Sequence, residues 1–330
     1  MDFITKSKNT FHSIKNDKQF ENDRNRVVSK GKRLLMNLFR FAVIIGICYV
    51  IVGPFIGIIS RSFFSDADQY NPMVYLIPTS PTLERYRLAF LRLDYIKVLI
   101  NTLSFDLLIM VLQIFVCSMV GYGFARFQFP FKKLLFGLVI VMIIMPTHTI
   151  MLPLYVTFQR FDILGIFKAI NGEAKNLLKT PNPMIIMTMF GCGLRSGLYI
   201  YIFNQFFRGL PKEIEEAAFV DGAGMWTTYY RIMLVNAIPS VITVAIFSLV
   251  WQYNDTFYSR LFVVDANLLL SRKIVSLQDT IANSDKILDI SIQNLYVNAG
   301  IVLVVLPVIL IYILLQKKFI EGVERSGIVG

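Results

Sequence analysis

The chain has 330 residues, of which 55% are hydrophobic and 17% are charged, and its mean hydropathy is +0.59. A soluble domain is rarely so apolar, so the composition indicates several membrane-spanning segments in spite of a net charge of +11. The three cysteines lie inside apolar runs and no Cys/His cluster has metal-ligand spacing, so neither a disulfide framework nor a bound metal is expected.

The N-terminal segment is strongly basic, with ten Lys or Arg residues against four acidic residues over positions 1–40. An apolar run follows directly, so this charge is better explained as a topological signal than as a nucleic-acid-binding arm. The run is too long for a signal-peptide core, and no small-residue cleavage site follows it. We therefore predict a cytoplasmic basic arm over residues 1–36 and one transmembrane domain over residues 37–330.

Six apolar segments are each long enough to cross a hydrocarbon core of about 30 Å, which needs roughly 20 helical residues. They lie near residues 37–60, 98–124, 134–156, 183–207, 239–263 and 295–316. The predicted fold class is therefore all-α, a polytopic membrane protein with six transmembrane helices. The regions then expected inside carry 19 Lys and Arg residues against 11 in the outer loops, which favours N and C termini in the cytoplasm.

Two of the outer loops are too long for tight turns. Residues 264–294 contain apolar clusters that predict short surface helices. Residues 165–182 have the pattern of an inserted amphipathic helix that ends before Pro181.

Two prolines interrupt the third predicted span. Pro146 and Pro153 flank Thr147-His148-Thr149. Proline removes a backbone hydrogen bond, and the freed carbonyl groups are tolerated in a membrane only where protein or water satisfies them. We therefore expect a break here, either facing a cavity with His148 near its outer end or forming a purely structural kink.

Arg195 is the most informative single residue of the fourth predicted span. A central arginine costs roughly 2.5–3.5 kcal/mol on insertion scales, so its side chain should face a wet cavity or a partner. Substrate contact or pathway lining is one hypothesis. The alternatives are an ion pair with Asp106 or Asp255, or a span boundary that lies elsewhere.

Polar and aromatic side chains also gather in the fifth predicted span. They are Trp251, Tyr253, Asn254 and Asp255. Sugars bind to such groups, with their C–H faces on rings and their hydroxyls on amides and carboxylates. We therefore predict that these side chains line the substrate pathway, the alternative being helix packing against a partner subunit.

The loop at residues 208–238 has the pattern of a short helix-turn-helix between two apolar runs. Pro211 can open a helix, acidic residues suit its N-terminal end, and Gly222 or Gly224 can close it. The small alanine side chains that follow the glutamates project little from the helix, so another protein can approach its backbone closely.

A set of motifs carries a family resemblance. In the loop the pattern is Glu216-Ala217-Ala218, then Gly222, then Ile232 and Leu234. It resembles the EAA loop of ABC-importer permeases, the segment that docks on a cytoplasmic ATPase. Further segments are similar to maltose-type sugar permeases: Pro81–Tyr86, Asn101–Thr102, Gly121–Arg126, Met145–Pro146, Trp251–Asp255 and Gln316–Gly330. Over residues 37–330 the chain thus resembles a carbohydrate ABC-importer permease, a binding-protein-dependent transport system inner membrane component.

The resemblance implies the type I ABC-importer permease fold, in a bacterial cytoplasmic membrane that the chain crosses several times. It implies an ATP-driven, binding-protein-dependent sugar importer. The partners implied are a second homologous permease, a dimer of cytoplasmic ABC ATPases, an extracellular sugar-binding protein and the lipid bilayer, but no nucleic acid. The chain itself would hold no cofactor, because ATP-Mg belongs to the ATPase and no phosphate-binding glycine motif occurs here.

The resemblance also implies a mechanical role for the loop, in which ATPase closure pushes its helix and switches the cavity between its inward and outward openings. The coupling residues implied are Glu215, Glu216, Ala217, Ala218, Asp221 and Gly222. No catalytic residue is expected, since the chain would be a transporter subunit and not an enzyme. Two alternatives stay open: a permease for a peptide, amino acid or polyamine, and an intramembrane enzyme acting on a lipid-linked sugar.

Overall fold

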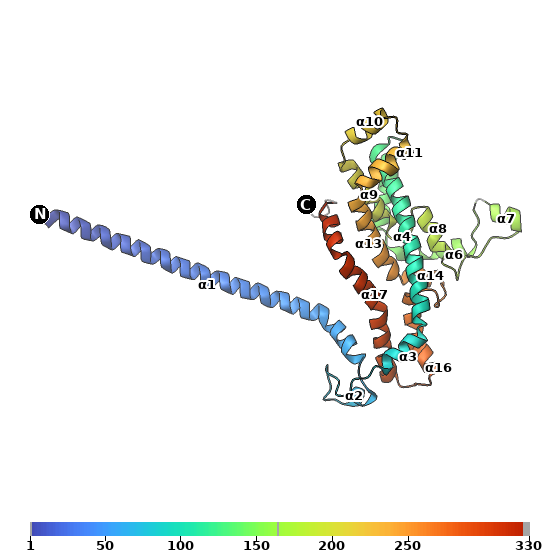
Figure 1. Ribbon diagram of the computed structural model, residues 1–330, viewed down its shortest axis with the longest axis horizontal. Coiled ribbons are helices and arrows are strands. Elements are labelled where there is room, and N and C mark those ends of the chain that lie inside the picture. The colour runs from blue at the N-terminus through green and yellow to red at the C-terminus, as the bar shows by residue number, and fades with distance from the viewer. Residues whose placement is uncertain (1, 164, 326–330) are drawn as a thin grey trace. The chain divides into compact units, whose positions relative to one another are not determined.

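The computed structural model describes residues 2–163 and 165–325 and is almost entirely helical (Figure 1). Within those residues the only β-type pairing is one isolated bridge between Phe161 and Lys175. The chain divides into two compact units, Met1–Ser60 and Arg61–Gly330. The predicted all-α fold class is therefore confirmed.

Helix α1 (Asp2–Arg61) makes up the first unit. Its segment Lys32–Arg61 is long and apolar enough to cross a membrane, which agrees with the first predicted span. The helix continues through position 36, where we predict the arm to end, and that domain boundary stays a prediction. The basic side chains up to residue 31 lie outside the described residues.

The second unit is built around two long helices, α4 (Tyr95–Arg126) and α17 (Ile290–Arg325). Between and beside them lie α2 (Asp66–Tyr70), α3 (Glu84–Arg92), α5 (Lys132–Ile144), η1 (Thr147–Ile150), α6 (Met151–Gln159), α7 (Ile166–Asn171), α8 (Asn182–Met189), α9 (Ser196–Gly209), α10 (Glu213–Val220), α11 (Met225–Thr228), η2 (Tyr229–Met233), α12 (Leu234–Asn236), α13 (Ile238–Tyr253), α14 (Phe257–Leu261), α15 (Leu270–Lys273), η3 (Ile274–Ser276) and α16 (Leu277–Ser284). Helices α10 and α11 lie at one end of this unit, and α2, α3 and α16 at the other (Figure 1).

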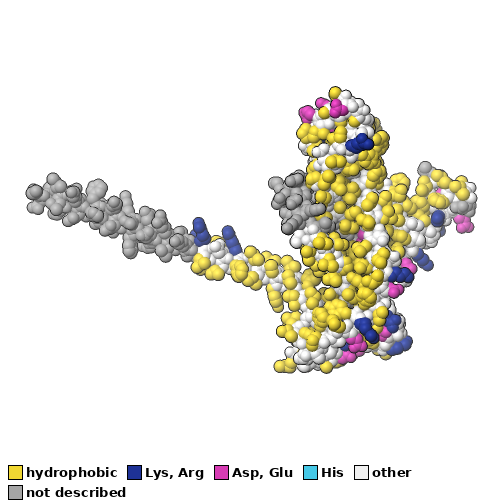
Figure 2. All heavy atoms as spheres, viewed as in Figure 1, with side chains coloured by type: hydrophobic (Ala, Val, Ile, Leu, Met, Phe, Trp, Pro, Cys, Tyr) yellow, Lys and Arg dark blue, Asp and Glu magenta, His cyan; other side chains and the backbone are white. Residues whose placement is uncertain are grey.

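The core of the second unit forms where α4 packs against α9 and α13, and where α17 packs against α13 and α3. Aromatic side chains dominate the first of these contacts, with Tyr199, Phe203 and Tyr229 fully buried. Apolar side chains also cover much of the visible surface between the two ends of this unit (Figure 2). An apolar surface of this kind suits a bilayer, because lipid tails solvate it.

The structure provides fewer continuous spans than the six predicted from hydropathy. Three helices qualify singly within the described residues: Lys32–Arg61, Tyr95–Arg126 and Ile290–Leu314. Two bent pairs also qualify, Lys132–Ile144 with Thr147–Gln159 at 105° and Met225–Asn236 with Ile238–Tyr253 at 76°. The described residues therefore hold three spans, or five if each bent pair is one span, and the count of six is not confirmed.

The prediction of a continuous helix over residues 183–207 was wrong. Helix α8 ends at Met189 and α9 begins at Ser196. Between them Gly191 and Arg195 have φ angles of 70° and 60°, in the left-handed region that ends a right-handed helix. The segment is apolar enough to suggest a span, but its glycines and arginine form a turn.

The other expected elements are partly confirmed. The predicted break at Pro146 is present between α5 and η1, whereas Pro153 lies inside α6. The fifth predicted span is shorter than expected, because α13 ends at Tyr253. The outer segment 264–294 does contain short helices, but the expected inserted helix is only α7, ended by Gly172 at φ 77°.

The close packing of α4 on α9 leads to a matched pair of substitutions. A Cβ atom added at Gly121 would lie 2.7 Å from the Phe203 Cβ, whereas one at Gly123 would meet nothing nearer than 3.9 Å. We expect Gly121→Ala to lower the free energy of unfolding by about 1–3 kcal/mol, since overpacking displaces the helices. Gly123→Ala should be neutral or stabilising, because alanine favours helix by roughly 1 kcal/mol. Thermal unfolding midpoints in detergent measure both, and equal midpoints would contradict the close contact.

Candidate functional site

Helix α10 ends in a well-formed capping motif. The Ala223 N–H donates to the Ala218 carbonyl at 2.9 Å, and the Gly222 N–H donates to the Phe219 carbonyl at 3.0 Å. Gly222 has φ 80°, which glycine adopts without strain. The predicted helix and its glycine end are confirmed, and the chain then turns into α11.

One face of α10 is held against α4 by a buried ion pair. Glu215 lies 2.9 Å from the Arg126 Nε, and its Oε1 accepts a hydrogen bond from the Tyr122 hydroxyl at 2.6 Å. Arg126 also donates through Nη2 to the Leu210 carbonyl at 2.8 Å. Because both charges are buried, these contacts fix α10 firmly to the end of α4.

The other face of α10 is exposed. We define the α10 surface as Glu216, Ala217, Phe219, Val220, Asp221, Gly222 and Trp226, all of them exposed. Val220 and Trp226 are 87% and 62% exposed. Acidic side chains gather at this end of the unit (Figure 2). Exposed apolar groups rimmed by charge are typical of a surface that another protein covers.

The predicted coupling residues therefore divide into two groups. Glu215 and Ala218 are buried against the rest of the unit. Glu216, Ala217, Asp221 and Gly222 belong to the exposed α10 surface. The sequence pattern alone gives the helix but does not say which of two adjacent glutamates faces inward.

A cavity of about 310 Å³ lies where two helix breaks meet helix α14, and we call it the Arg195 cavity. Met145 and Thr147 line it from the break between α5 and η1. Residues 192–197 line it from the break between α8 and α9, and Tyr258 from α14. In a membrane, irregular backbone is tolerated where it lines a cavity or is buried in protein. The two breaks that line this cavity are therefore compatible with a membrane location.

Arg195 lies on the wall of this cavity and is exposed. Its guanidinium carbon is 4.8 Å from the Trp251 ring centroid, and Trp251 stacks on Phe247 with centroids 5.3 Å apart. Among the described residues, Arg195 forms no ion pair with Asp106 or Asp255. The structure thus brings two predicted pathway residues together as a cation over an indole ring.

Gln113 supports the turn that carries Arg195, and sequence reasoning missed it. Its Nε2 donates to the Leu194 carbonyl at 2.8 Å, and its Oε1 accepts from the Ser248 hydroxyl at 2.5 Å. The amide thereby satisfies a carbonyl that the break between α8 and α9 leaves free. A glutamine in the middle of the apolar run 98–124 was the available signal.

The other predicted pathway side chains contact backbone groups. Tyr253 is buried and donates its hydroxyl to the Val304 carbonyl at 2.6 Å. Asn254 donates through Nδ2 to the Val250 carbonyl at 2.8 Å, at the end of α13. Asp255 is buried and accepts from the Ser259 N–H at 2.9 Å, at the start of α14. In this conformation they shape the break between α13 and α14.

His148 is exposed in η1, beside the proline break. Its ring meets the Phe257 ring edge-on with centroids 5.0 Å apart. The neighbouring Thr147 and Ile150 line the Arg195 cavity, so His148 lies at its margin. A substrate contact from this side chain stays a prediction.

The end of the unit opposite α10 is held together by charged side chains. Arg92 donates to Asp285 at 2.9 Å, which raises the pKa of Arg92. The Tyr70 hydroxyl donates to Asp289, which lowers the pKa of that carboxyl and raises that of the tyrosine. These contacts join α2 and α3 to the chain before α17.

Asp68 organises the loop after α2. Its carboxylate accepts hydrogen bonds from Thr79, Ser65 and Ser80, and the Thr79 hydroxyl contributes most to lowering its pKa. The carboxylate is therefore ionised at neutral pH and fastens this loop.

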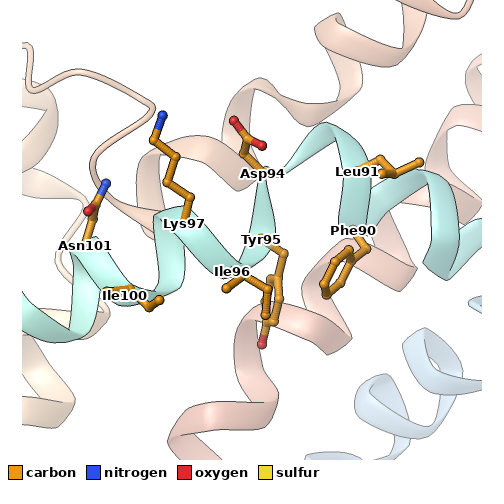
Figure 3. Close-up of a pocket in the computed structure, with 8 residues that line it drawn as sticks. All are labelled: Phe90, Leu91, Asp94, Tyr95, Ile96, Lys97, Ile100 and Asn101. Carbon is orange, nitrogen blue, oxygen red and sulfur yellow. The ribbon is translucent and has the colours of Figure 1, made fainter.

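The corner between α3 and α4 forms a hollow of about 530 Å³. Asp94 turns the chain there with φ 50°. In Figure 3, Asp94 and Lys97 point to one side of the helix, and Phe90 and Tyr95 to the other. The exposed polar side gives this end of the unit a surface suited to a polar partner.

Among the described residues, no three His, Cys, Asp or Glu side chains are close enough to hold a metal.

Sequence relatives of this chain are permease proteins of uptake systems. It is 25% identical to the diacetylchitobiose uptake system permease protein NgcG of Streptomyces coelicolor, over 84% of each chain. It is 26% identical to the arabinooligosaccharides transport system permease protein AraQ of Halalkalibacterium halodurans, over 86% of this chain and 93% of that protein. These relatives are transporter subunits, which confirms that reading over an enzyme.

The fold is also found in a solved structure, a bacterial ABC transporter involved in the import of the acidic polysaccharide alginate. The TM-score is 0.66 at 21% sequence identity, covering 84% of this chain and 94% of that one. The profile of the family described as binding-protein-dependent transport system inner membrane component matches residues 113–324. Because the match spans more than half of the sequence and includes both α10 and the Arg195 cavity, the chain belongs to this family of transport-system inner membrane components.

Proposed function

We propose that this chain is a permease subunit of an ATP-driven importer for an oligosaccharide. The observation that carries the proposal is a continuous connection along α4. Tyr122 and Arg126 near its end hold α10, and Gln113 in its middle holds the turn before Arg195. Thirteen residues of helix span roughly 20 Å, so a force on the α10 surface reaches the cavity through one rigid element.

The proposed partners follow from the surfaces at the two ends. An ABC ATPase dimer, which holds ATP-Mg, covers the exposed α10 surface, and a second homologous permease completes the pathway. A solved neighbour with TM-score 0.57 is an alginate ABC transporter in complex with an alginate-pentasaccharide-bound periplasmic protein. By analogy an extracellular binding protein docks on the end that carries α2, α3 and α16.

The Arg195 cavity supports a sugar as cargo. Its wall combines the hydrogen-bond donors of Arg195 and Thr147 with apolar side chains and the Tyr258 ring, which suits the hydroxyls and the C–H faces of a pyranose. The relatives NgcG and AraQ are named for the uptake of diacetylchitobiose and arabinooligosaccharides. A cationic polyamine fits poorly, because Arg195 would repel it.

The orientation we propose places α10 and both chain termini in the cytoplasm of a bacterial cell. The Lys and Arg distribution of the sequence supports it. ATPase closure on the α10 surface then moves α4 and α9 together and changes the opening of the Arg195 cavity. The binding protein delivers the sugar to the outward opening, and hydrolysis resets the pump.

The assembly can be tested with a pair of glycine substitutions. Gly222 has φ 80° whereas Gly224 has φ −72°, and an added Cβ meets no atom at either position. Left-handed backbone costs a non-glycine residue about 1–2 kcal/mol, so Gly222→Ala should reduce ATP-driven uptake roughly 5- to 30-fold. Gly224→Ala should leave uptake unchanged.

The measurement is uptake into proteoliposomes, together with identification of the proteins that co-purify with the tagged chain. We expect a second permease and an ATPase with the unmodified chain. Less ATPase should co-purify with the Gly222→Ala variant. A chain that purifies alone from gently solubilised native membranes would overturn the importer assignment.

Glu215 and Glu216 form a second matched pair. Glu215→Gln leaves the Arg126 guanidinium buried without a counter-charge, which costs about 3–5 kcal/mol when a buried pair is broken. We expect faster proteolysis within residues 208–238 and a lower thermal midpoint. Glu216→Gln, on the exposed face, should change neither. If Arg126→Gln added to Glu215→Gln restored no stability, the ion pair would not be the contact that holds α10.

Arg195 can be tested for substrate contact with a series of side chains. Arg195→Lys keeps the charge but loses the planar stack on Trp251. It also presents fewer hydrogen-bond donors to a sugar, and since one net hydrogen bond is worth about 0.5–1.5 kcal/mol, this change should weaken the apparent affinity for sugar roughly 2- to 13-fold. Arg195→Ala should weaken it further, and Arg260→Ala, exposed outside the cavity, should not. Uptake of a panel of labelled oligosaccharides measures the series, and unchanged affinity in Arg195→Ala would remove this residue from the pathway.

A further inference from the structure

A second large pocket lies beside α10, on the side of α4 that faces α5 and α9. Its volume is about 790 Å³, and it is lined from the end of α4, the start of α5 and the end of α9. Its polar lining includes Arg126, Lys132, Lys133, Asn204, Arg208 and Lys212, and we call it the basic pocket. It is separate from the Arg195 cavity, since the two share no lining residue.

The basic pocket concentrates positive charge without a matching carboxylate. Of its five cationic side chains, Arg126 is paired with Glu215. In the described part of the chain, the other four have no carboxylate oxygen within salt-bridge distance. Lys132 donates to the Phe127 carbonyl at 2.8 Å but keeps its charge. No acidic residue lines the pocket, so its field favours an anion.

A buried amide on the pocket wall adds a second requirement. Asn204 is only 2% exposed, and its Nδ2 donates to the Gly121 carbonyl at 3.3 Å. Its Oδ1 is buried and has no hydrogen-bond donor among the described residues. Buried polar atoms are nearly always partnered, so a donor from outside the chain is expected here. A ligand with an anionic group and a nearby hydroxyl meets both requirements.

Apolar groups on the wall favour a lipid as the source of that ligand. Four phenylalanines line the basic pocket, and Phe131 at the start of α5 is 75% exposed. In the proposed orientation the pocket lies at the cytoplasmic end of α4 and α5, the level at which headgroups would meet the hydrocarbon core. Basic pockets between transmembrane helices on the cytoplasmic side are suited to anionic lipid headgroups. A zwitterionic headgroup would bring its own cation among the lysines.

We propose that the basic pocket binds the headgroup of an anionic phospholipid, with its phosphate among Lys132, Lys133, Arg208 and Lys212 and a headgroup hydroxyl donated to Asn204. Phosphatidylglycerol has this chemistry. The site borders the contact that holds α10, because Arg126 belongs to both. The assignment to the cytoplasmic leaflet rests on the proposed function, but the chemistry of the pocket does not.

The experiment measures lipid binding to the full chain, purified with whatever proteins accompany it and delipidated in a neutral detergent. Acyl-labelled phosphatidylglycerol is titrated and followed by fluorescence anisotropy. We expect Lys133→Gln with Arg208→Gln to weaken binding roughly tenfold or more, since each cation near an anionic headgroup contributes to affinity. The control Lys97→Gln with Arg260→Gln removes the same charge outside the pocket and should bind like the unmodified chain.

Three ligands separate the requirements and the source. Labelled phosphatidylcholine should bind weakly to every variant. Phosphatidylmethanol has the charge but no headgroup hydroxyl, so it should bind the unmodified chain more weakly than phosphatidylglycerol does. The Asn204→Leu variant should bind these two lipids with equal affinity. Free glycerol phosphate at millimolar concentration should not displace the lipid, and complete displacement would assign the site to a soluble phosphate instead.

Equal binding of phosphatidylglycerol by the pocket variant and its charge control would overturn the proposal. Since the titration needs neither ATP nor sugar, its outcome is independent of the importer assignment. A chain that binds the lipid at this pocket but purifies without an ATPase would retain the lipid site and lose the proposed function. A chain that purifies with an ATPase but does not bind the lipid at this pocket would retain the proposed function and lose the lipid site.

Discussion

The structure depends on one constraint, that backbone polar groups inside a membrane must be satisfied within the protein or by trapped water. The chain breaks its helices at Pro146, between Gly191 and Arg195, and after Tyr253. Each break would be costly if it faced lipid. The first two breaks instead line one cavity, and Gln113 takes up the Leu194 carbonyl that the second of them releases. The same requirement therefore accounts for the position of the cavity beside irregular backbone.

The constraint also explains why α4 is the central element of the second unit. It is unbroken over 32 residues, so it forms a rigid connection between the α10 segment at its end and the turn before Arg195 near its middle. Its packing on α9 is close enough that Gly121 leaves no room for a methyl group. Helix α9 begins at Ser196, directly after Arg195, and ends near the α10 segment, so its close packing on α4 links the two regions.

Hydropathy and local signals predicted much of this architecture. The limits of α4 and α17 lie within a few residues of the predicted spans at one or both ends, because long apolar runs have few alternatives to a helix. The α10 helix was predictable because its glycine end is local. The break before Ser196 was not predictable, because a hydropathy average measures how apolar a segment is and contains no information about left-handed φ angles. The inward turn of Glu215 depends on Tyr122 and Arg126, which are far away in sequence.

The exposed face of α10 has a further consequence for the isolated chain. Val220 and Trp226 expose large apolar surfaces beside carboxylates. Helix α10 is only eight residues long, too short to be stable alone, so the buried Glu215–Arg126 contact must maintain its shape. The loop is thus preformed before any partner arrives, and binding does not have to fold it. Preformed surfaces lose little conformational entropy on association. Under the proposed function, an ATPase that docked here would therefore not have to order the loop before its closing motion displaced α4.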